Sequence, residues 1–467
     1  MKNLRKLTLV LTFVFFGLVM GTESSEATLQ PGDLQLLIDK AEPGDVIVLE
    51  PGVWEGGVLI NKPLSLIGGG EAIIDGGGEG SVITVKSSAV TLNGLIIRNS
   101  GTRLDQENSG ISSEFTPDIR IENNKFESVL FGVFLRHADR ALISGNEIGG
   151  MDLFIARRGD GIRIWQSEDA VVENNYMHNG RDAVFWFTDR VTVRSNHVTD
   201  SRYGLHFMYS DEALVEGNLL ENNSVGAFLM YSTDLTVLNN IFRNNKGPSG
   251  YGLGIKDVDG LLVQGNRFTE NRSGFYADNS PSRVGVTHLI DGNVFAFNDI
   301  GVLLGSTVAR NTFTGNAFLD NAKQAASDGT GGLGDNSWAD DGVGNYWSDF
   351  AGFDANEDGV GDIAYQIDNL FFNLVERHPS LSFFNGTPAA LFIDMASQAF
   401  PHLRADPILI DESPLIELPE FNPTPFPAPS SSRFALILFS TLFLILAALI
   451  MTNDRFKSKP LKTSQVI

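Results

Sequence analysis

The 467-residue chain contains no cysteine, so it must hold its fold together without disulfides and offers no thiolate to a metal. It is also poor in cations. Its 34 lysines and arginines face 57 aspartates and glutamates, which gives a formal net charge of −23 at pH 7. Residues 1–27 carry a net charge of +1 and residues 433–467 a net charge of +4, so the part between them is more acidic still, at −23 − 1 − 4 = −28. This balance argues against nucleic acid as a partner and favours a cation or a basic protein surface.

Helical periodicity is missing as well. Between Val82 and Leu319 no stretch keeps the 3.6-residue period over the 10 or more residues that a helical repeat needs. The apolar runs are instead four to six residues long, rich in Val, Ile, Leu, Phe and Thr, and broken by Gly, Asn and Asp. This pattern is typical of short strands separated by turns.

A repeated asparagine organises these strands. It is followed two residues later by a hydrophobic or aromatic residue, and it recurs in steps of 21 to 29 residues at Asn124, Asn146, Asn175, Asn196, Asn218, Asn240, Asn266, Asn293 and Asn316. Eight residues after most of them, a Gly or Ala opens an apolar run. Two longer gaps, to Gly161 and Gly252, place insertions in one loop of the repeat. Self-similarity of this kind indicates stacked repeats.

The repeat predicts an all-β fold, a right-handed parallel β-helix in which the asparagines stack as an internal ladder. We expect the β-helix to span 28–325, followed by an Asp/Gly-rich cap at 326–370. A C-terminal segment at 371–413 should contain a helix around Ala389 to Phe400, either a cap or a contact near the membrane.

Both ends of the chain are hydrophobic. Residues 1–27 are typical of a signal peptide, with Lys2, Arg5 and Lys6 before an apolar stretch and Ser25-Glu26-Ala27 as a cleavage site. A Pro/Ser-rich linker at 414–433 leads to 18 uncharged residues at 434–451, which are just long enough to cross a bilayer, and to a basic tail at 452–467. The positive-inside rule places the tail in the cytoplasm, so we expect an extracytoplasmic or periplasmic protein anchored to the cytoplasmic membrane.

Strand alternation, counted from the Gly/Ala position, predicts which residues face outward. It places Val184 and Trp186 in the core, together with Met177 of another strand. The predicted outward face carries Phe185, Phe187, His206, Met208, Phe228 and Met230. Met208 and Met230 lie one coil apart, so they should stack at about 4.8 Å. Thioethers and an imidazole suit Cu(I). The sequence therefore predicts a soft-metal site at His206, Met208 and Met230, or a docking surface that includes Phe185, Phe187 and Phe228. The alternative is that another segment covers these residues and makes them ordinary core.

A second metal is suggested after the repeats. Oxygen-bearing residues alternate through an Asp/Gly-rich loop, in which Gly359 stands at a sharp turn: Asp354, Asn356, Asp358, Val360 through its carbonyl, and Asp362. This spacing is typical of calcium loops, although Tyr365 occupies the position where such loops carry a glutamate. A turn without metal is the alternative.

Four stretches carry a resemblance to a known family. They are GRDAVFW from Gly180, RYGLHFMYS from Arg202, GAFLMYS from Gly226, and GNYWSDF with its acidic loop from Gly344. Over roughly Gln30 to Leu409 the chain resembles the NosD family, maturation proteins of nitrous oxide reductase. The resemblance implies a non-catalytic β-helix protein that works with the NosF ATPase and the NosY membrane protein as an ABC-type complex. It also implies the copper carrier NosL and the apo-reductase as partners, and a role in assembling the reductase's copper centres. The apolar stretch at 434–451 departs from the family, whose members are soluble periplasmic proteins held by NosY.

The alternative function is a carbohydrate-active enzyme, because β-helices often host polysaccharide lyases, hydrolases and epimerases. Such an enzyme needs converging carboxylates. Asp160, Asp182 and Asp278 are the candidates, but Asp160 and Asp182 precede the Gly/Ala position, where turns favour Asp for local reasons.

Overall fold

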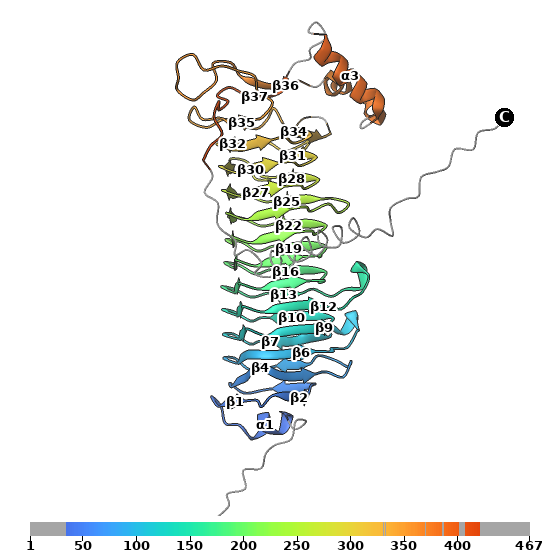
Figure 1. Ribbon diagram of the computed structural model, residues 1–467, viewed down its shortest axis with the longest axis vertical. Helices are drawn as coiled ribbons and strands as arrows, with labels where there is room; N and C mark the ends of the chain where they lie inside the picture. Colours follow the sequence, from blue (N-terminus) through green and yellow to red (C-terminus); the bar gives the residue numbers. More distant parts are fainter. Residues whose placement is uncertain are drawn as a thin grey trace, which may run out of the picture.

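The computed structural model describes residues 34–420 except 330, 332, 369, 385–386 and 401–406. These residues form an elongated parallel β-solenoid, as the sequence predicts (Figure 1). At its first end lies helix α1 (Leu34–Lys40), which buries Leu34 and Ile38. The predicted signal peptide, the apolar stretch at 434–451 and the basic tail lie outside the described residues. Within the described part, no helix combines the length and apolar character needed to cross a membrane.

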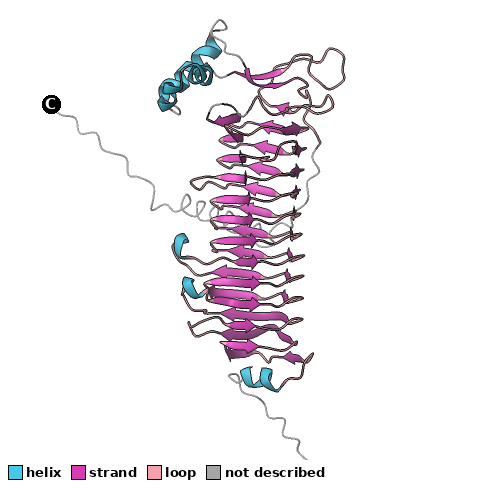
Figure 2. Ribbon diagram, turned by 180° about the vertical axis from the view of Figure 1, so that it is seen from behind, coloured by secondary structure: helices cyan, strands magenta, loops and turns pink. Residues whose placement is uncertain are grey.

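One face of the solenoid is a parallel sheet of 12 strands (Figure 2). They are β3 (Val58–Ile60), β5 (Ile83–Val85), β7 (Ser109–Glu114), β10 (Phe131–Arg136), β13 (Ile162–Trp165), β16 (Asp182–Trp186), β19 (Tyr203–Met208), β22 (Val225–Met230), β25 (Tyr251–Lys256), β28 (Ser273–Asp278), β31 (Ile300–Gly305) and β34 (Lys323–Asp328). Every pair of neighbours in this sheet is one coil apart. We call its outer side the broad face.

The remaining coil strands form a sheet of 23 strands with two ladders, joined because β4 and β6 run through the bend between them. The strands are β1 (Val46–Val48), β2 (Gly52–Glu55), β4 (Ser65–Asp75), β6 (Thr91–Arg98), β8 (Arg120–Glu122), β9 (Lys125–Val129), β11 (Leu142–Ser144), β12 (Glu147–Gly150), β14 (Val171–Glu173), β15 (Tyr176–His178), β17 (Thr192–Arg194), β18 (His197–Thr199), β20 (Leu214–Glu216), β21 (Leu219–Glu221), β23 (Thr236–Leu238), β24 (Ile241–Arg243), β26 (Leu262–Gln264), β27 (Arg267–Thr269), β29 (His288–Asp291), β30 (Val294–Ala296), β32 (Asn311–Thr314), β33 (Ala317–Leu319) and β35 (Tyr346–Trp347).

The predicted asparagine ladder lies at the bend between the two short strands of each coil. The side-chain oxygen of Asn218 accepts from the backbone N–H and the side-chain amide of Asn196, at 2.9 and 3.0 Å. The amide of Asn218 in turn donates to Val193 O and to the Oδ1 of Asn240, both at 2.9 Å. These asparagines are fully buried, so the ladder satisfies backbone groups that water cannot reach.

The ladder continues one coil beyond the predicted repeats and then changes residue. Asn345 is its last asparagine, and Asp411 from the C-terminal segment accepts from the Asn345 backbone N–H at 2.8 Å. Asp411 also accepts from the Trp347 indole at 2.8 Å. Burial raises the pKa of the Asp411 carboxyl against these hydrogen bonds. The last coil is therefore closed by a residue that returns from 66 positions further along the chain.

Two further ladders were not predicted. A second asparagine ladder stands five residues after the first, at Asn223, Asn245, Asn271, Asn298 and Asn321. A hydroxyl ladder occupies the corner after the broad-face strands, where Ser210 and Ser232 accept the backbone N–H groups of Thr188 and Ser210 at 3.0 Å. The serines of the two MYS motifs therefore have a structural role at this corner.

The core between the sheets is filled by stacked side chains. Met177 lies in it as predicted, 2% exposed and paired in register with Ile148 and Val198. Further along, aromatic rings stack coil upon coil at centroid distances of 4.2 to 5.0 Å, through Phe242, Phe268, Phe295, Phe318 and Trp347. Trp347, which lies beyond the predicted end of the β-helix at residue 325, thus continues the core stack.

The cap combines an antiparallel strand pair with a small helical unit. Strands β36 (Tyr365–Asp368) and β37 (Pro407–Asp411) pair with each other. Between them lie α2 (Leu370–Arg377), the 3-10 helix η3 (Pro379–Phe384) and α3 (Pro388–Ala399). Helix α3 coincides with the predicted helix, and the Thr387 hydroxyl caps it by accepting from Ala390 N. Two other 3-10 helices, η1 (Leu104–Gln106) and η2 (Ile155–Arg157), lie in loops of the solenoid.

One buried histidine makes the stability of the solenoid depend on pH. His288 is 1% exposed, and its Nε2 lies 3.1 Å from the carbonyl oxygen of Val258. Burial lowers the pKa of His288 to about 4, from an ordinary value of 6.5. As the pH falls below 6.5, His288 becomes protonated in the unfolded chain but stays neutral in the folded chain. The free energy of unfolding therefore decreases as the pH falls from 6.5 to about 4.

We predict that His288→Gln removes this part of the pH dependence. In the wild-type chain the group should lower the free energy of unfolding by about 2–3 kcal/mol between pH 7 and pH 4. Denaturant unfolding of both chains at pH 7, 5.5 and 4.5 measures the difference. An equal pH dependence in the two chains would show that His288 is not buried in its neutral form.

Candidate functional site

The predicted site lies on the broad face, but one coil has a different register from the one predicted. Asp182 pairs with Tyr203 and Val184 pairs with His206, so Ala183 alone stands opposite Gly204 and Leu205. This coil is one residue short, which agrees with its 21-residue step between Asn175 and Asn196. The prediction counted inner and outer positions from Ala183 as in the other coils. Because this coil lacks one residue, that count assigns the inward-facing residues of β16 to the outside and the outward-facing ones to the core.

The prediction that Phe185 faces outward is wrong. Its side chain is fully buried and stacks on Phe207 in the core at 4.7 Å. Val184 and Trp186, predicted to be core, lie on the broad face, Val184 opposite His206 and Trp186 opposite Met208. Trp186 is half-buried, whereas Val184 is 1% exposed.

The structure brings the three predicted soft ligands onto one face. Met208 and Met230 are direct register partners on β19 and β22, and both are half-buried. His206 lies two residues before Met208, in register with half-buried Phe228. His206 is only 5% exposed, because Trp186 and Tyr203 pack edge-on against its ring at 5.8 and 4.9 Å.

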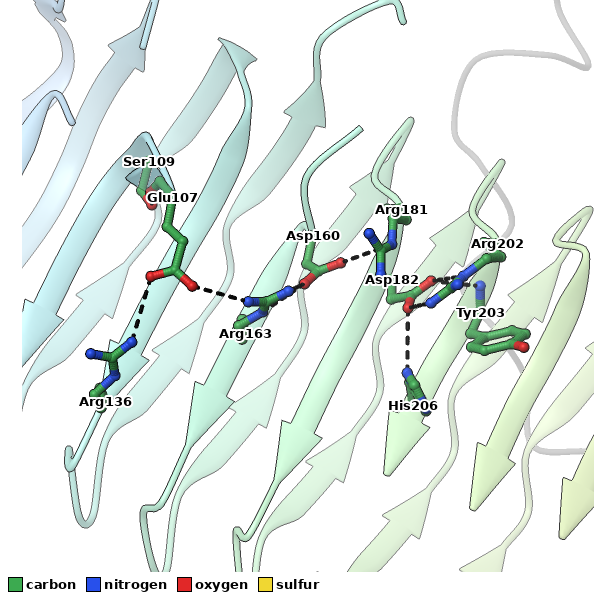
Figure 3. Close-up of polar contacts among 10 residues, drawn as sticks. All are labelled: Glu107, Ser109, Arg136, Asp160, Arg163, Arg181, Asp182, Arg202, Tyr203 and His206. Atoms are coloured by element: carbon green, nitrogen blue, oxygen red, sulfur yellow. Dashed lines mark hydrogen bonds and ion pairs between the residues drawn. The ribbon is translucent and has the colours of Figure 1, made fainter. Parts of the chain in front are cut away.

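A buried carboxylate orients this histidine. Asp182 is 2% exposed, and its Oδ2 lies 3.3 Å from Nδ1 of His206. Asp182 also pairs with the Arg202 guanidinium and accepts from Tyr203 N at 3.2 Å (Figure 3). Burial alone would raise the pKa of Asp182, but the hydrogen bonds from His206 and Arg202 outweigh it and the pKa lies below its ordinary value.

The Asp182 contact determines which ring nitrogen of His206 is available. A carboxylate only accepts hydrogen bonds, so Nδ1 carries the proton of this contact, and Nε2 is the ring nitrogen that can ligate a metal from the neutral imidazole. Histidines that bind metals commonly donate their other nitrogen to a carboxylate in this way. Together with the methionine pair, the arrangement supplies one imidazole and two thioethers, and this donor set suits Cu(I).

A second group of alternating charges lies on the preceding coils of the broad face. Asp160, one coil before Asp182, is 1% exposed and lies 2.6 Å from an Arg163 nitrogen. Arg163 also reaches Glu107 at 3.4 Å, and Glu107 reaches Arg136 at 3.5 Å. The Arg181 Nε stands 3.9 Å from Asp160 (Figure 3).

Asp160 and Asp182 hold different arginines, Asp160 in the Arg163 group and Asp182 with Arg202. Burial raises the pKa of Asp160 against the opposing charge of Arg163, whereas the pKa of Asp182 is lowered. Asp278 lies apart from both and pairs with Lys256 at 2.8 Å.

The structure gives several residues roles that the sequence did not indicate. Trp186 covers His206, and Asp182 orients it. Tyr209 and Tyr231 follow the two methionines directly and stack on each other at 5.1 Å. Phe187, which the sequence predicted to face outward, joins this stack from the preceding coil and is 48% exposed. The doubled MYS motif was the available signal, because each MYS places a tyrosine beside a methionine.

The predicted calcium loop is held mainly by its own carboxylates. Asp354 accepts the backbone N–H groups of Glu357 and Gly359 at 2.6 and 2.8 Å, and Asp362 accepts from Ala355 N at 2.6 Å. Asn356 donates to Asp358 at 2.9 Å, and Val360 N donates to the same carboxylate at 2.9 Å. Among the described residues, no three His, Asp or Glu side chains are grouped so that they could hold a metal ion.

Comparisons with known proteins agree with the resemblance in the sequence. Residues 144–352 match the sequence model of a family described as "Periplasmic copper-binding protein (NosD)". A Pseudomonas aeruginosa protein named "Probable ABC transporter binding protein NosD" is 31% identical over 413 residues, 84% of this chain and 95% of that protein. A Stutzerimonas stutzeri protein of the same name is 28% identical over 383 residues, 79% of this chain and 86% of that protein.

Among solved structures, the chain is similar to the Streptococcus pneumoniae surface protein and adhesin PfbA. The TM-score is 0.48 and the identity 12%, over 63% of this chain and 94% of that one. This likeness says nothing about function.

Proposed function

The chain belongs to the NosD family, and from this premise we propose that it is the extracytoplasmic component of a NosDFY-type ABC complex. In this proposal it supports maturation of the copper centres of nitrous oxide reductase. It works with the NosF ATPase and the NosY membrane protein, and it docks a NosL-like copper carrier and the apo-reductase. Residues 1–27 direct its export, and residues 434–451 anchor it beside NosY.

One observation carries the copper part of the proposal. Met208 and Met230 are adjacent in register on one face, and His206 is held beside them with its Nδ1 bound to Asp182. We call His206, Met208 and Met230 the copper face. Copper is cargo here and must be released again. Half-buried thioethers suit this transfer, because they bind Cu(I) without the thiolates that would hold it most tightly.

The test of the proposed function is the copper content of the reductase. We expect reductase from cells that lack this chain to be deficient in copper, and reductase from cells that regain the wild-type chain to be loaded normally. Full copper loading in its absence would contradict the proposal.

Calcium stays a prediction. The family description names copper and not calcium, and the Asp354 carboxylate already accepts backbone hydrogen bonds.

A second candidate function has one observation in its favour. Asp160 and Asp182 lie in adjacent coils, and their pKa values are shifted in opposite directions, as in acid–base pairs of carbohydrate-active enzymes. Both carboxylates are at most 2% exposed and are neutralised by arginines, which disfavours access by a sugar. Cleavage or epimerisation of a polysaccharide by the purified chain, lost in Asp160→Asn and Asp182→Asn, would support the enzyme.

A further inference from the structure

One corner of the solenoid forces its residues into a left-handed backbone. The residue that follows each broad-face strand has φ between 45° and 56° in eight coils: Phe115, His137, Gln166, Phe187, Tyr209, Tyr231, Asp257 and Asn279. The stacking imposes this conformation. The backbone N–H of Phe187 donates to Met208 O at 3.0 Å, and that of Tyr209 donates to Met230 O at 3.2 Å. Each coil thus repeats the same turn.

Aromatic side chains are a poor choice for such a turn. A side chain with a Cβ is strained there by about 1–2 kcal/mol, and Gly, Asn and Asp tolerate it best. Asp257 and Asn279 show that this same corner accepts small polar residues. The fold itself therefore does not require Phe187, Tyr209 or Tyr231.

A second corner of the same chain provides a comparison. The position just before the first asparagine ladder has the same left-handed backbone, and it is occupied by Asn123, Gly145, Asn174, Ser195, Gly217, Asn239, Gly265, Gly292 and Gly315. No aromatic residue stands at that position in these coils. Phe115 after β7 and the aromatic residues after β16, β19 and β22 depart from the residues that the turn favours. The latter three stand in consecutive coils as one stack of three rings, and strained positions gather at functional sites.

The three side chains form one exposed feature, which we call the aromatic corner: Phe187, Tyr209 and Tyr231. Phe187 and Tyr209 are 48% and 46% exposed, and Tyr231 is half-buried. Their rings stack at 5.1 Å with interplanar angles of 10° and 15°. Phe187 and Tyr231 stack on Tyr209, so the faces of its ring are covered and mainly its edge is exposed to solvent.

The aromatic corner adjoins the copper face directly. Met208 precedes Tyr209 and Met230 precedes Tyr231, and Trp186 precedes Phe187 in the same way. Aromatic residues and methionine are enriched at the centres of protein interfaces, where they are surrounded by a polar rim. A partner seated on the aromatic corner would stand next to the two thioethers.

The rim of the corner is acidic. In the same three coils, the residues that follow include Asp189, Asp211, Glu212 and Asp234. The cation among them, Arg190, is already paired with Asp169 at 2.7 Å and with Glu168. Charge complementarity therefore selects a partner with a basic rim around an apolar centre.

We propose that the aromatic corner is the centre of the docking surface for a basic protein partner, the copper carrier that exchanges Cu(I) with the copper face. This inference rests on the proposed function and adds to it the residues, the chemistry of the partner surface and the separation of docking from metal binding. Each docking tyrosine directly follows a metal-ligand methionine in the sequence, so the tyrosines can be substituted without changing the methionines.

The test replaces Tyr209 and Tyr231 with Asn in the full chain, in complex with its ATPase and membrane subunits. The probe is the purified NosL-like carrier, and its affinity is measured by calorimetry at low and high salt. We expect the Kd for the carrier to rise by about 30-fold or more, since tyrosines that become buried under a bound partner are typical interface hot spots. Cu(I) affinity of the chain should stay within twofold, because the methionines remain. Equal carrier affinity in variant and wild type would overturn the inference.

The matched control is Phe115→Asn. Phe115 is 66% exposed and has the same left-handed backbone, but it lies outside the three coils. We expect its carrier Kd to stay within twofold of the wild type, and a loss as large as that of the tyrosine variant would overturn the choice of residues. If the Asn variant fails to fold, Tyr209→Gly with Tyr231→Gly replaces it, because glycine suits the turn.

The outcomes also separate this inference from the proposed function. If the wild-type chain binds the carrier and the tyrosine variant binds it equally, only the aromatic corner is refuted. If the wild-type chain does not bind the carrier, the carrier partnership and the inference both fail.

Discussion

Replacing Asn218 with alanine should lower the free energy of unfolding by about 2–6 kcal/mol. The substitution leaves the fully buried backbone N–H of Asn196 without its partner, at a cost of about 1–3 kcal/mol. It also removes the hydrogen bonds that the Asn218 amide donates to Val193 O and to Asn240 Oδ1, each worth about 0.5–1.5 kcal/mol. Each coil of a solenoid contacts the coils before and after it, so losing the Asn218 hydrogen bonds weakens the packing of this coil against both neighbours. Guanidinium unfolding followed by circular dichroism measures the effect.

Asn222→Gly is the control for this loss. Asn222 is exposed and has a left-handed backbone, which glycine adopts without strain. Its amide oxygen accepts one bond, from Asn244 at 2.7 Å, at the surface. We expect a change below about 1 kcal/mol. A similar small change for Asn218→Ala would contradict the structural role of the ladder.

The second large effect concerns function. Met208→Leu combined with Met230→Leu should reduce the copper content of co-produced reductase about tenfold or more, as expected when metal ligands are lost. Leucine keeps nearly the same volume, at a cost of less than about 1.5 kcal/mol, but cannot ligate a metal. The fold and the aromatic corner should stay intact. The measurement is copper per purified reductase, by mass spectrometry.

Met177→Leu provides the matched control, since Met177 is 2% exposed in the core and offers its sulfur to no partner surface. Normal copper loading is expected for this variant. If the double variant also loads the reductase normally, its thioethers take no part in copper transfer.

The sequence predicted the features that depend on periodicity. A nearly constant repeat length places equivalent residues of successive coils next to each other. It therefore predicts the asparagine ladder, the core position of Met177 and the shared face of Met208 and Met230. The same reasoning failed at Phe185. The 21-residue coil shows that one residue is missing, but only the pairing of Ala183 shows where.

Other features arise from contacts that periodicity does not encode. Glu107 belongs to an inserted loop and meets Arg163 across 56 residues of sequence. Asp411 returns from beyond the cap to close the ladder. The left-handed backbone of Tyr209 and Tyr231 became meaningful only once the turn geometry of each coil was known. In contrast, the second ladder was visible as Asn residues five positions after the first.

The central claim is that His206, Met208 and Met230 bind Cu(I), and the most direct test is Cu(I) binding by the purified full chain. A chelator competition under reducing conditions gives the affinity, and X-ray absorption of the bound copper gives the ligands. We predict one Cu(I) per chain, with sulfur and imidazole scattering, that is lost in the Met208→Leu and Met230→Leu double variant. Failure to compete for Cu(I), or unchanged affinity and sulfur scattering in the double variant, would contradict the claim.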